Sequence, residues 1–359
     1  MTGIALEFVV VSVALALLCA AVPNRWLPYA LPLTGAVGIL LIAPWSLLWI
    51  LVLTTGLSGL HALPVNPGLR LRGLLLFVGV STVALLWLRE LTWLEALGAA
   101  YFSLRAIHVA LDVWMGRYRI PKPLPLLGYM LFFPVFLVGP IHRFPDFART
   151  LQRRRQSAQD LFAGFERVLV GIFVTVVLGG WLINLSQELV SEWNRTLHPF
   201  LLDWLYSVIG WVDLYFVFGG MSAVAIGAAR IIGLEVQENF NRPFLARSLA
   251  EFWTRWHISL TSWCRDYVYQ PVSSMLRNHV VGVFASMLVL GLWHETSLYY
   301  ILWAAWQALG IVLSRRLAPV YNALPSRLDI LLSPFLVLAW LSLAKPIATR
   351  IDAAIWTLL

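Results

Sequence analysis

Long apolar stretches recur along this chain, and they constrain its fold more than any other feature of the sequence. A helix needs about 20 residues to cross the hydrocarbon core of a bilayer, where the backbone must satisfy its own hydrogen bonds. The stretches are residues 4–22, 26–44, 46–60, 73–88, 124–141, 168–185, 200–234, 280–293, 298–313 and 329–344. We therefore predict an all-α polytopic membrane protein, in which the shorter stretches are tilted, broken or re-entrant helices.

The composition agrees with this fold class. Hydrophobic residues make up 60% of the 359 residues and charged residues 12%, whereas a soluble domain carries about 25% charged residues. The net charge of +8 does not indicate a nucleic-acid partner, because Lys and Arg also mark the cytoplasmic loops of membrane proteins. Residues 4–22 lack a basic leader and precede further spans, so we expect a transmembrane helix there rather than a secretion signal. The sequence shows no repeat and no linker, and we expect residues 1–359 to form a single membrane-embedded domain.

The segment 123–141 is apolar but dense in proline and glycine, which break helices. Basic residues flank it on both sides: Arg117, Arg119 and Lys122 before it, and Arg143, Arg149, Arg153, Arg154 and Arg155 after it. A crossing segment would place these clusters on opposite sides of the membrane, against the positive-inside bias. We therefore predict a re-entrant loop that returns to the cytoplasmic side and packs in protein or lines a cavity. The arginines at 153–155 are expected to mark topology or to contact lipid headgroups.

A second unusual segment, residues 238–270, is rich in charged residues and in tryptophan, although it lies between apolar stretches. On one continuous helix, Trp253, His257, Thr261 and Arg265 would share a face at i, i+4 spacing. Such a mixed helix suits the membrane interface or a protein-lined funnel rather than lipid.

Two histidines in apolar, tryptophan-rich sequence, His257 and His294, are the strongest candidates for chemistry. An ionisable group at membrane depth is costly, so it is a functional candidate that faces a cavity or a partner. Histidine also transfers protons near neutral pH. His108 and Asp112, four residues apart, are expected to form a structural pair rather than a functional one.

Four sequence blocks resemble the membrane-bound O-acyltransferase family, in the bacterial branch that includes alginate O-acetyltransferases and the D-alanyl transfer proteins of teichoic acids. The blocks read FFP, GPI and RFPDF between residues 132 and 147, ENFNRPF at 238–244, FWTRWHISL and WCRDYVYQP at 252–271, and GLWH at 291–294. Four ordered blocks are more specific than one short motif. They place the motif-bearing core at about residues 129–310.

The resemblance implies a ring of tilted, partly re-entrant helices around a central funnel or tunnel, in the bacterial cytoplasmic (inner) membrane. It makes His294 the catalytic histidine and places His257 in the same tunnel. His294 would take the proton of an attacking hydroxyl, because an alcohol needs a base to attack a thioester. His257 would orient that hydroxyl, bind the acyl group or return a proton to the leaving thiolate. The oxyanion needs donors, and Asn241, Arg265 and Trp indole groups are candidates.

The residues that we expect to bind substrate lie in the same blocks. They are Asn241, Arg242, Trp256, Arg265, Asp266, Trp293 and Glu295. Alternative structural roles stay open for two groups. Residues 241–243 also fit a capped turn between membrane segments, and the adjacent charges of Arg265 and Asp266 favour a salt bridge.

The reaction that the resemblance implies is transfer of a short acyl group, for which we expect acetyl, to a hydroxyl of a cell-envelope glycan or polymer. The donor would be a cytoplasmic thioester: acetyl-CoA, another acyl-CoA or an acylated carrier protein. Five basic residues suit its phosphates: Arg117, Arg119, Lys122, Arg143 and Arg149. The implied partners are membrane lipids, this donor, the acceptor, and an acyl carrier or a second extracytoplasmic transferase, with no nucleic acid.

Alternatives within this chemistry are lipid, protein and small-molecule acceptors. From other classes, a transporter with a histidine proton relay and a non-catalytic partner of another acyltransferase stay open. The two cysteines and the absence of His-x-x-x-His or Cys-x-x-Cys patterns give no reason to expect a metal site or a tightly bound cofactor.

Three features depart from the family pattern. Glu295 follows His294 where glycine is usual, and this carboxylate would either orient the imidazole or bind the acceptor. Ala223 stands where an acidic residue is usual, and the chain ends at residue 359, sooner than many bacterial members. These departures bear on the acceptor more than on the type of reaction.

Overall fold

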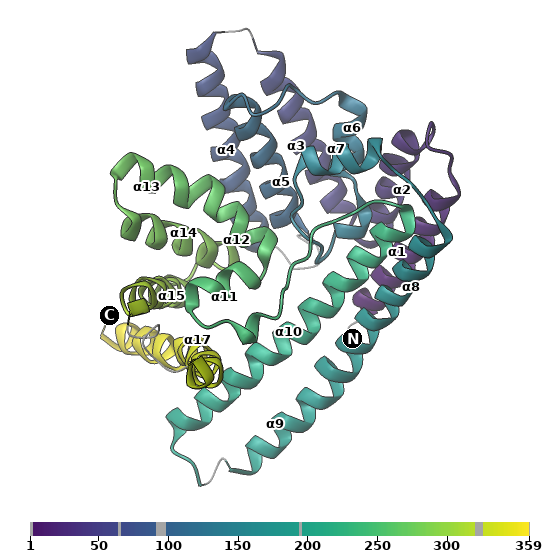
Figure 1. Cartoon of the computed structure of the whole chain (residues 1–359). Coiled ribbons are helices and arrows are strands. Elements are labelled where there is room, and N and C mark those ends of the chain that lie inside the picture. Colours follow the sequence, from purple (N-terminus) through teal and green to yellow (C-terminus); the bar gives the residue numbers. More distant parts are fainter. Residues whose placement is uncertain (1–2, 64–65, 91–97, 194–195, 320–325, 359) are drawn as a thin grey trace. The chain divides into compact units, whose positions relative to one another are not determined.

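The computed structural model describes residues 3–63, 66–90, 98–193, 196–319 and 326–358, and this part of the chain is helical with no β-strand (Figure 1). Five of its helices are long and apolar enough to cross a membrane: Pro44–Ala62, Pro67–Leu86, Ala158–Glu192, Pro199–Ile232 and Leu332–Ala354. Shorter apolar helices include Leu6–Ala21, Leu27–Ile42 and His279–His294. The prediction of an all-α polytopic membrane protein is confirmed, whereas the central funnel stays a prediction.

The chain divides into two compact units, which we describe separately. Unit 1 comprises residues 1–172 and 220–237, and unit 2 comprises residues 173–219 and 238–359. Helices α8 (Ala158–Phe173) and α10 (Pro199–Ile232) carry the chain across the division.

Unit 1 begins with helices that follow the first apolar stretches of the sequence. These are α1 (Gly3–Ala21), α2 (Leu27–Ile42), α3 (Pro44–Ala62) and α4 (Pro67–Glu90), and neighbours in sequence pack together as α1 with α2 and α3 with α4. Gly35 lets α2 approach the segment after α6 (Pro123–Met130), because a side chain at this position would collide with the carbonyl oxygen of Leu131.

Helix α5 (Ala99–Trp114) is not among the apolar stretches predicted from the sequence, because its polar residues lower the mean hydropathy of this segment. Every residue from 102 to 110 is buried, including Arg105 and His108. The helix packs against α3 and α4, and protein surrounds its polar side chains. Hydropathy finds helices that face lipid, and it does not find a helix whose polar groups are buried in the protein.

The proline- and glycine-rich segment breaks the helix as predicted. Helix α6 ends at Met130, a single 3₁₀ turn follows at η1 (Phe133–Val135), and α7 (Phe144–Gln152) begins only at Phe144. Residues 128–136 and 139–142 are buried, so this irregular backbone packs in protein, as backbone at membrane depth requires. Its return to the cytoplasmic side stays a prediction.

The expectation that residues 153–155 contact lipid headgroups is wrong for Arg154, whose side chain is buried. Its guanidinium donates hydrogen bonds of 2.7 to 3.2 Å to the ends of two helices of unit 1 and to two side chains. The acceptors are the carbonyls of Cys19, Ala20 and Val22 at the end of α1, that of Ile232 at the end of α10, and the side chains of Asn24 and Gln156. Carbonyls at helix C-termini lack hydrogen-bond donors within the helix, and the guanidinium of Arg154 provides these donors.

Unit 2 contains three of the four sequence blocks, those at 238–244, 252–271 and 291–294. Its elements are the π-helical η2 (Val174–Leu182), α9 (Ile183–Glu192), η4 (Pro243–Leu245), α11 (Leu249–Arg255), α12 (Ile258–Cys264), the π-helical η5 (Arg265–Tyr269), α13 (Gln270–Leu276), α14 (His279–His294), α15 (Leu298–Arg316) and α17 (Ser326–Leu358). Helices α14 and α15 lie side by side, and α15 packs on α17 (Figure 1). Trp306 and Trp340 stack at 4.3 Å between α15 and α17.

The prediction of one continuous helix through residues 253–265 is wrong. Helix α11 ends at Arg255, Trp256 is extended, and His257 has left-handed backbone angles (φ 42°, ψ 53°) before α12 begins. The backbone of this break forms hydrogen bonds with another segment, so His257 does not share a helical face with Trp253 and Arg265. Spacing alone cannot reveal such a break, because no proline or glycine marks it.

Arg154 generates a prediction for stability. The substitution Arg154→Met should lower the free energy of unfolding by about 3 kcal/mol, because it leaves several buried carbonyls without a donor. Arg154→Lys should recover only part of this loss, since an ammonium cannot reproduce the fork of the guanidinium. The measurement is unfolding of the purified protein in one detergent. Arg153→Met is the matched control at an exposed neighbour and should change stability by less than about 0.5 kcal/mol; equal losses would contradict the role of Arg154.

Candidate active site

His257 is positioned by backbone hydrogen bonds between two irregular segments of unit 2. The N–H of Asn241 donates to the carbonyl of Arg255, and the N–H of Ile258 donates to the carbonyl of Asn239, both at 2.9 Å. The hydroxyl of Ser259 donates to the side-chain oxygen of Asn239 at 2.7 Å, and both side chains are fully buried. A non-glycine residue in the left-handed region costs about 1–3 kcal/mol and persists only where its surroundings fix it, which is frequent at functional sites.

Aromatic rings surround the imidazole of His257, which is 4% exposed. The ring of Phe218, on α10, meets it edge-on with 4.6 Å between centroids, and Trp293, on α14, lies at 5.6 Å. Burial lowers the pKa of His257 well below its usual value, and the nearby His294 lowers that pKa further. His257 is therefore a neutral imidazole at physiological pH, suited to hydrogen bonding rather than to holding a positive charge.

His294 lies in a different environment, although Trp293 contacts both histidines. It is the last residue of α14, it is exposed, and its ring centroid lies 4.9 Å from that of Trp293. Tyr300 stacks on it at 5.4 Å with nearly parallel planes (16°), and Trp303 meets it edge-on at 5.8 Å.

The loop after His294 fixes the position of the rings that flank it. Glu295 is extended (φ −164°, ψ 147°), and its N–H still bonds to the carbonyl of Gly291. Ser297 then caps α15 by accepting a hydrogen bond from the N–H of Tyr300. The short turn between α14 and α15 therefore brings Tyr300 and Trp303 against His294. The arrangement combines an exposed base with a buried, neutral hydrogen-bonding imidazole, and this combination suits proton transfer to and from a bound hydroxyl.

Comparisons with known proteins identify the family of this chain. The model of the membrane-bound O-acyltransferase family matches residues 115–348, which is well over half of the chain. This chain belongs to the membrane-bound O-acyltransferase family. The sequence resemblance to that family is thereby confirmed.

Curated relatives are similar over part of their length. A probable alginate O-acetylase of Pseudomonas aeruginosa is 31% identical over 240 residues, which are 65% of this chain and 45% of the relative. A teichoic acid D-alanyltransferase of Bacillus subtilis is 28% identical over 227 residues (59% and 57%), and that of Streptococcus thermophilus is 31% identical over 239 residues (62% and 57%). The chain thus spans about half the length of the curated relatives that it matches.

The other predicted substrate residues occupy distinct positions in unit 2. Trp256 is buried and stacks on Phe252 at 5.4 Å, so it supports the turn that carries His257. Arg265, in η5, is paired with Asp266 at 2.8 Å, which agrees with the favoured salt bridge. Asn241 and Arg242 are exposed, and Arg242 adopts left-handed angles (φ 46°) at the start of η4, as in a turn.

Sequence reasoning missed Asn239 and Ser259, although both lie within the motif blocks. Their hydrogen bond is visible only once the segments before and after α11 are folded together. The available signal was a small polar residue in each of two motif blocks, but the sequence does not distinguish Asn239 from Asn241, which lies two residues later.

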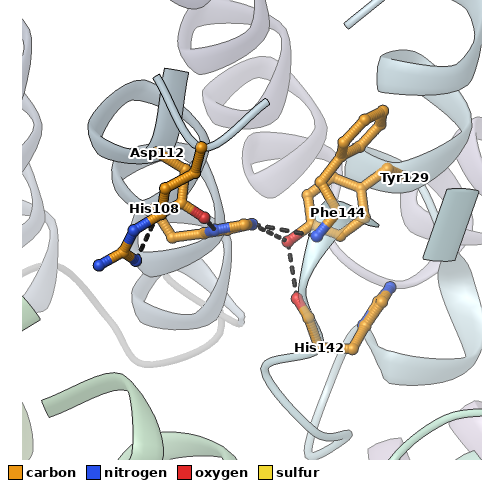
Figure 2. A network of polar contacts seen from close by, with 6 residues as sticks. His108, Asp112, Tyr129, His142 and Phe144 are labelled. Atoms are coloured by element: carbon orange, nitrogen blue, oxygen red, sulfur yellow. Dashed lines mark hydrogen bonds and ion pairs between the residues drawn. The ribbon is translucent and has the colours of Figure 1, made fainter. Parts of the chain in front are cut away.

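A separate polar network in unit 1 involves His108 and Asp112 (Figure 2). The N–H of Phe144 donates to Nε2 of His108 at 3.1 Å, so Nδ1 carries the proton and faces Asp112 at 3.3 Å. The hydroxyl of Tyr129 lies 3.1 Å from Nε2 of His108 and donates to the carbonyl of His142 at 2.7 Å. These bonds hold α5 to the irregular segment before α7, which supports the structural role expected for this pair.

Asn239 and Ser259 generate a prediction for the support of His257. Each of Asn239→Ala and Ser259→Ala should lower the free energy of unfolding by about 1–3 kcal/mol, because each leaves a buried partner without this hydrogen bond. The double variant should cost less than the sum of the single variants, with a coupling of about 1 kcal/mol. Unfolding of the purified wild type, the two single variants and the double variant gives this coupling. Asn241→Ala, at an exposed position, is the control. If the losses of the two single variants simply add in the double variant, the hydrogen bond between Asn239 and Ser259 does not stabilise this turn.

Proposed function

We propose that this chain is an O-acyltransferase in which His294 acts as general base. The observation that carries the proposal is the exposed imidazole of His294 at the end of α14, held between Tyr300 and Trp303 and linked through Trp293 to the buried His257. Membership of the family supplies the type of reaction, and the geometry supplies a base and a hydrogen-bonding partner for it.

The reaction transfers an acyl group from sulfur to oxygen. The acceptor oxygen attacks the carbonyl carbon of the thioester while His294 takes the hydroxyl proton. The tetrahedral intermediate then breaks its C–S bond, and the thiolate receives that proton from the imidazolium of His294. The products are an ester and a thiol. His257, which stays neutral, hydrogen-bonds the acceptor hydroxyl or the acyl oxygen.

The remaining substrate candidates are assigned to binding. Asn241, Arg265 and the indole N–H of Trp293 are proposed donors to the oxyanion, and Glu295, which follows the base, is proposed to orient the imidazole or to bind the acceptor. Arg242, Asp266 and Trp256 are proposed to line the acceptor or donor path. The family match covers parts of both units, so we propose that units 1 and 2 together form one acyltransferase domain.

The substrates follow from what the relatives share. One kind of relative is a probable alginate O-acetylase and the other a teichoic acid D-alanyltransferase. Both act on a polymer, and both transfer a short acyl group. We propose a cell-envelope glycan or polymer as the acceptor and a short acyl group, acetyl, as the cargo. The donor is a cytoplasmic thioester, either an acyl-CoA or an acylated carrier protein, and the protein resides in the bacterial cytoplasmic membrane.

The substitution His294→Ala tests the proposal. Turnover should fall by about 10²–10⁴-fold, because the attacking hydroxyl loses its base, while the protein remains folded. The measurement is thiol release from acetyl-CoA, or from an acetylated carrier protein, by the protein in proteoliposomes with candidate polymers.

His279→Ala is the matched control, since His279 is another exposed histidine and begins the same helix. It should leave turnover unchanged. Full turnover by His294→Ala would contradict the role of His294 as general base. Transport of a solute without any acyl transfer would instead favour a transporter.

A further inference from the structure

Unit 1 contains a large cavity that the proposed chemistry does not use. Its volume is about 870 Å³, and residues of α7, the start of α8, the end of α10 and the segment after α10 line it. This volume lies in the range of pockets for small molecules and cofactors. All lining residues belong to unit 1, whereas His257 and His294 belong to unit 2.

Arginine dominates the charged groups of this cavity. The positive side chains are Arg149, Arg153, Arg155 and Arg230, and the negative ones are Asp146, Asp160 and Glu235. Two of the carboxylates are already engaged, because Asp146 pairs with Arg149 at 3.0 Å and Asp160 pairs with Arg230 at 3.4 Å. Each guanidinium has five N–H groups, so a single contact with a carboxylate leaves further donors.

Arg153 and Arg155 are exposed, and within the described part of the chain neither forms an ion pair. Their placement follows from Arg154, whose buried guanidinium anchors the chain between the ends of α1 and α10. Because Arg154 is fixed inward, its two neighbours line the cavity on either side of the anchor. The backbone here is also held closely, since Gly233 (φ 85°) ends α10 against Arg154 and Arg155.

We propose that this cavity binds a phosphate-bearing anion through Arg153 and Arg155, with Arg149 and Arg230 as further donors. Guanidinium groups bind phosphate oxygens with paired, charge-assisted hydrogen bonds. The positive-inside bias predicts the cytoplasmic side for the arginine-rich segment 149–155, where anionic lipid headgroups and soluble phosphate compounds both occur. The carboxylate of Glu235 also lines the cavity, and the four guanidinium groups outnumber the three carboxylates.

The shared chemistry of the ligand is a phosphate ester, and two sources can supply it. One source is the headgroup of an anionic lipid, and the other is a soluble phosphate compound such as the nucleotide part of an acyl-CoA. Only the second source would connect the cavity to the proposed acyl transfer, so binding is tested separately from turnover.

The experiment uses the full chain in lipid nanodiscs, with two probes. In the first arm, native mass spectrometry measures the retention of phosphatidylglycerol in mixed phosphatidylglycerol–phosphatidylcholine nanodiscs. In the second arm, calorimetry in phosphatidylcholine nanodiscs measures binding of adenosine 3′,5′-bisphosphate. We expect one probe to bind, with an affinity that falls as the salt concentration rises.

The double variant Arg153→Gln/Arg155→Gln should weaken that binding by about tenfold or more, because two charge-assisted contacts are lost. The single variant Arg155→Gln provides a second test, which alters only one residue of the cavity. The matched control, Arg25→Gln/Arg316→Gln, removes two exposed arginines outside the cavity and should leave the affinity unchanged.

Binding that is lost in the cavity variants and kept in the control supports the site, and the probe that binds identifies the source. Absence of binding by both probes, or equal binding by cavity variants and wild type, overturns it. His294→Ala should bind the probe as wild type does, so failure of the base and failure of this site give different results.

Discussion

The structure depends on one constraint, which is that backbone outside a helix must find hydrogen-bond partners inside the protein when it lies among membrane helices. Two segments meet this constraint in different ways. Residues 131–136 and 139–142 are buried, and the hydroxyl of Tyr129 donates to the carbonyl of His142. Residues 239–241 and 255–258 instead bond to each other. Irregular backbone at such depth is tolerated only under these conditions.

The same constraint produces the candidate site. The break between α11 and α12 is stable because Asn239 and Ile258 are joined through the backbone and Asn239 and Ser259 through their side chains. It places His257 among Phe218 and Trp293, where the imidazole stays neutral. His294, on the other side of Trp293, remains exposed. The two histidines therefore have unlike environments, and this difference supports the different roles that we propose for them.

Much of this architecture is predictable from the sequence, and the exceptions share a cause. The apolar stretches predicted the spanning helices, and proline and glycine predicted the break after α6, since both signals are local. Helix α5, the break at His257 and the buried position of Arg154 depend on partners remote in sequence, such as the end of α1 for Arg154. The family blocks identified His257 and His294, but they could not identify Asn239, whose role is a contact across 20 residues.

The pH dependence of kcat/KM for acyl transfer tests the central claim most directly. Burial, and to a smaller extent His294, keeps the pKa of His257 well below its usual value, so His257 stays neutral near neutral pH. Protonation of His294 removes the base, so the rate of the wild type should fall toward acid pH across the range where imidazoles titrate, about pH 6–7. The residual activity of His257→Gln should keep this acid limb. A wild-type rate that is constant from pH 5 to 8 would contradict the account.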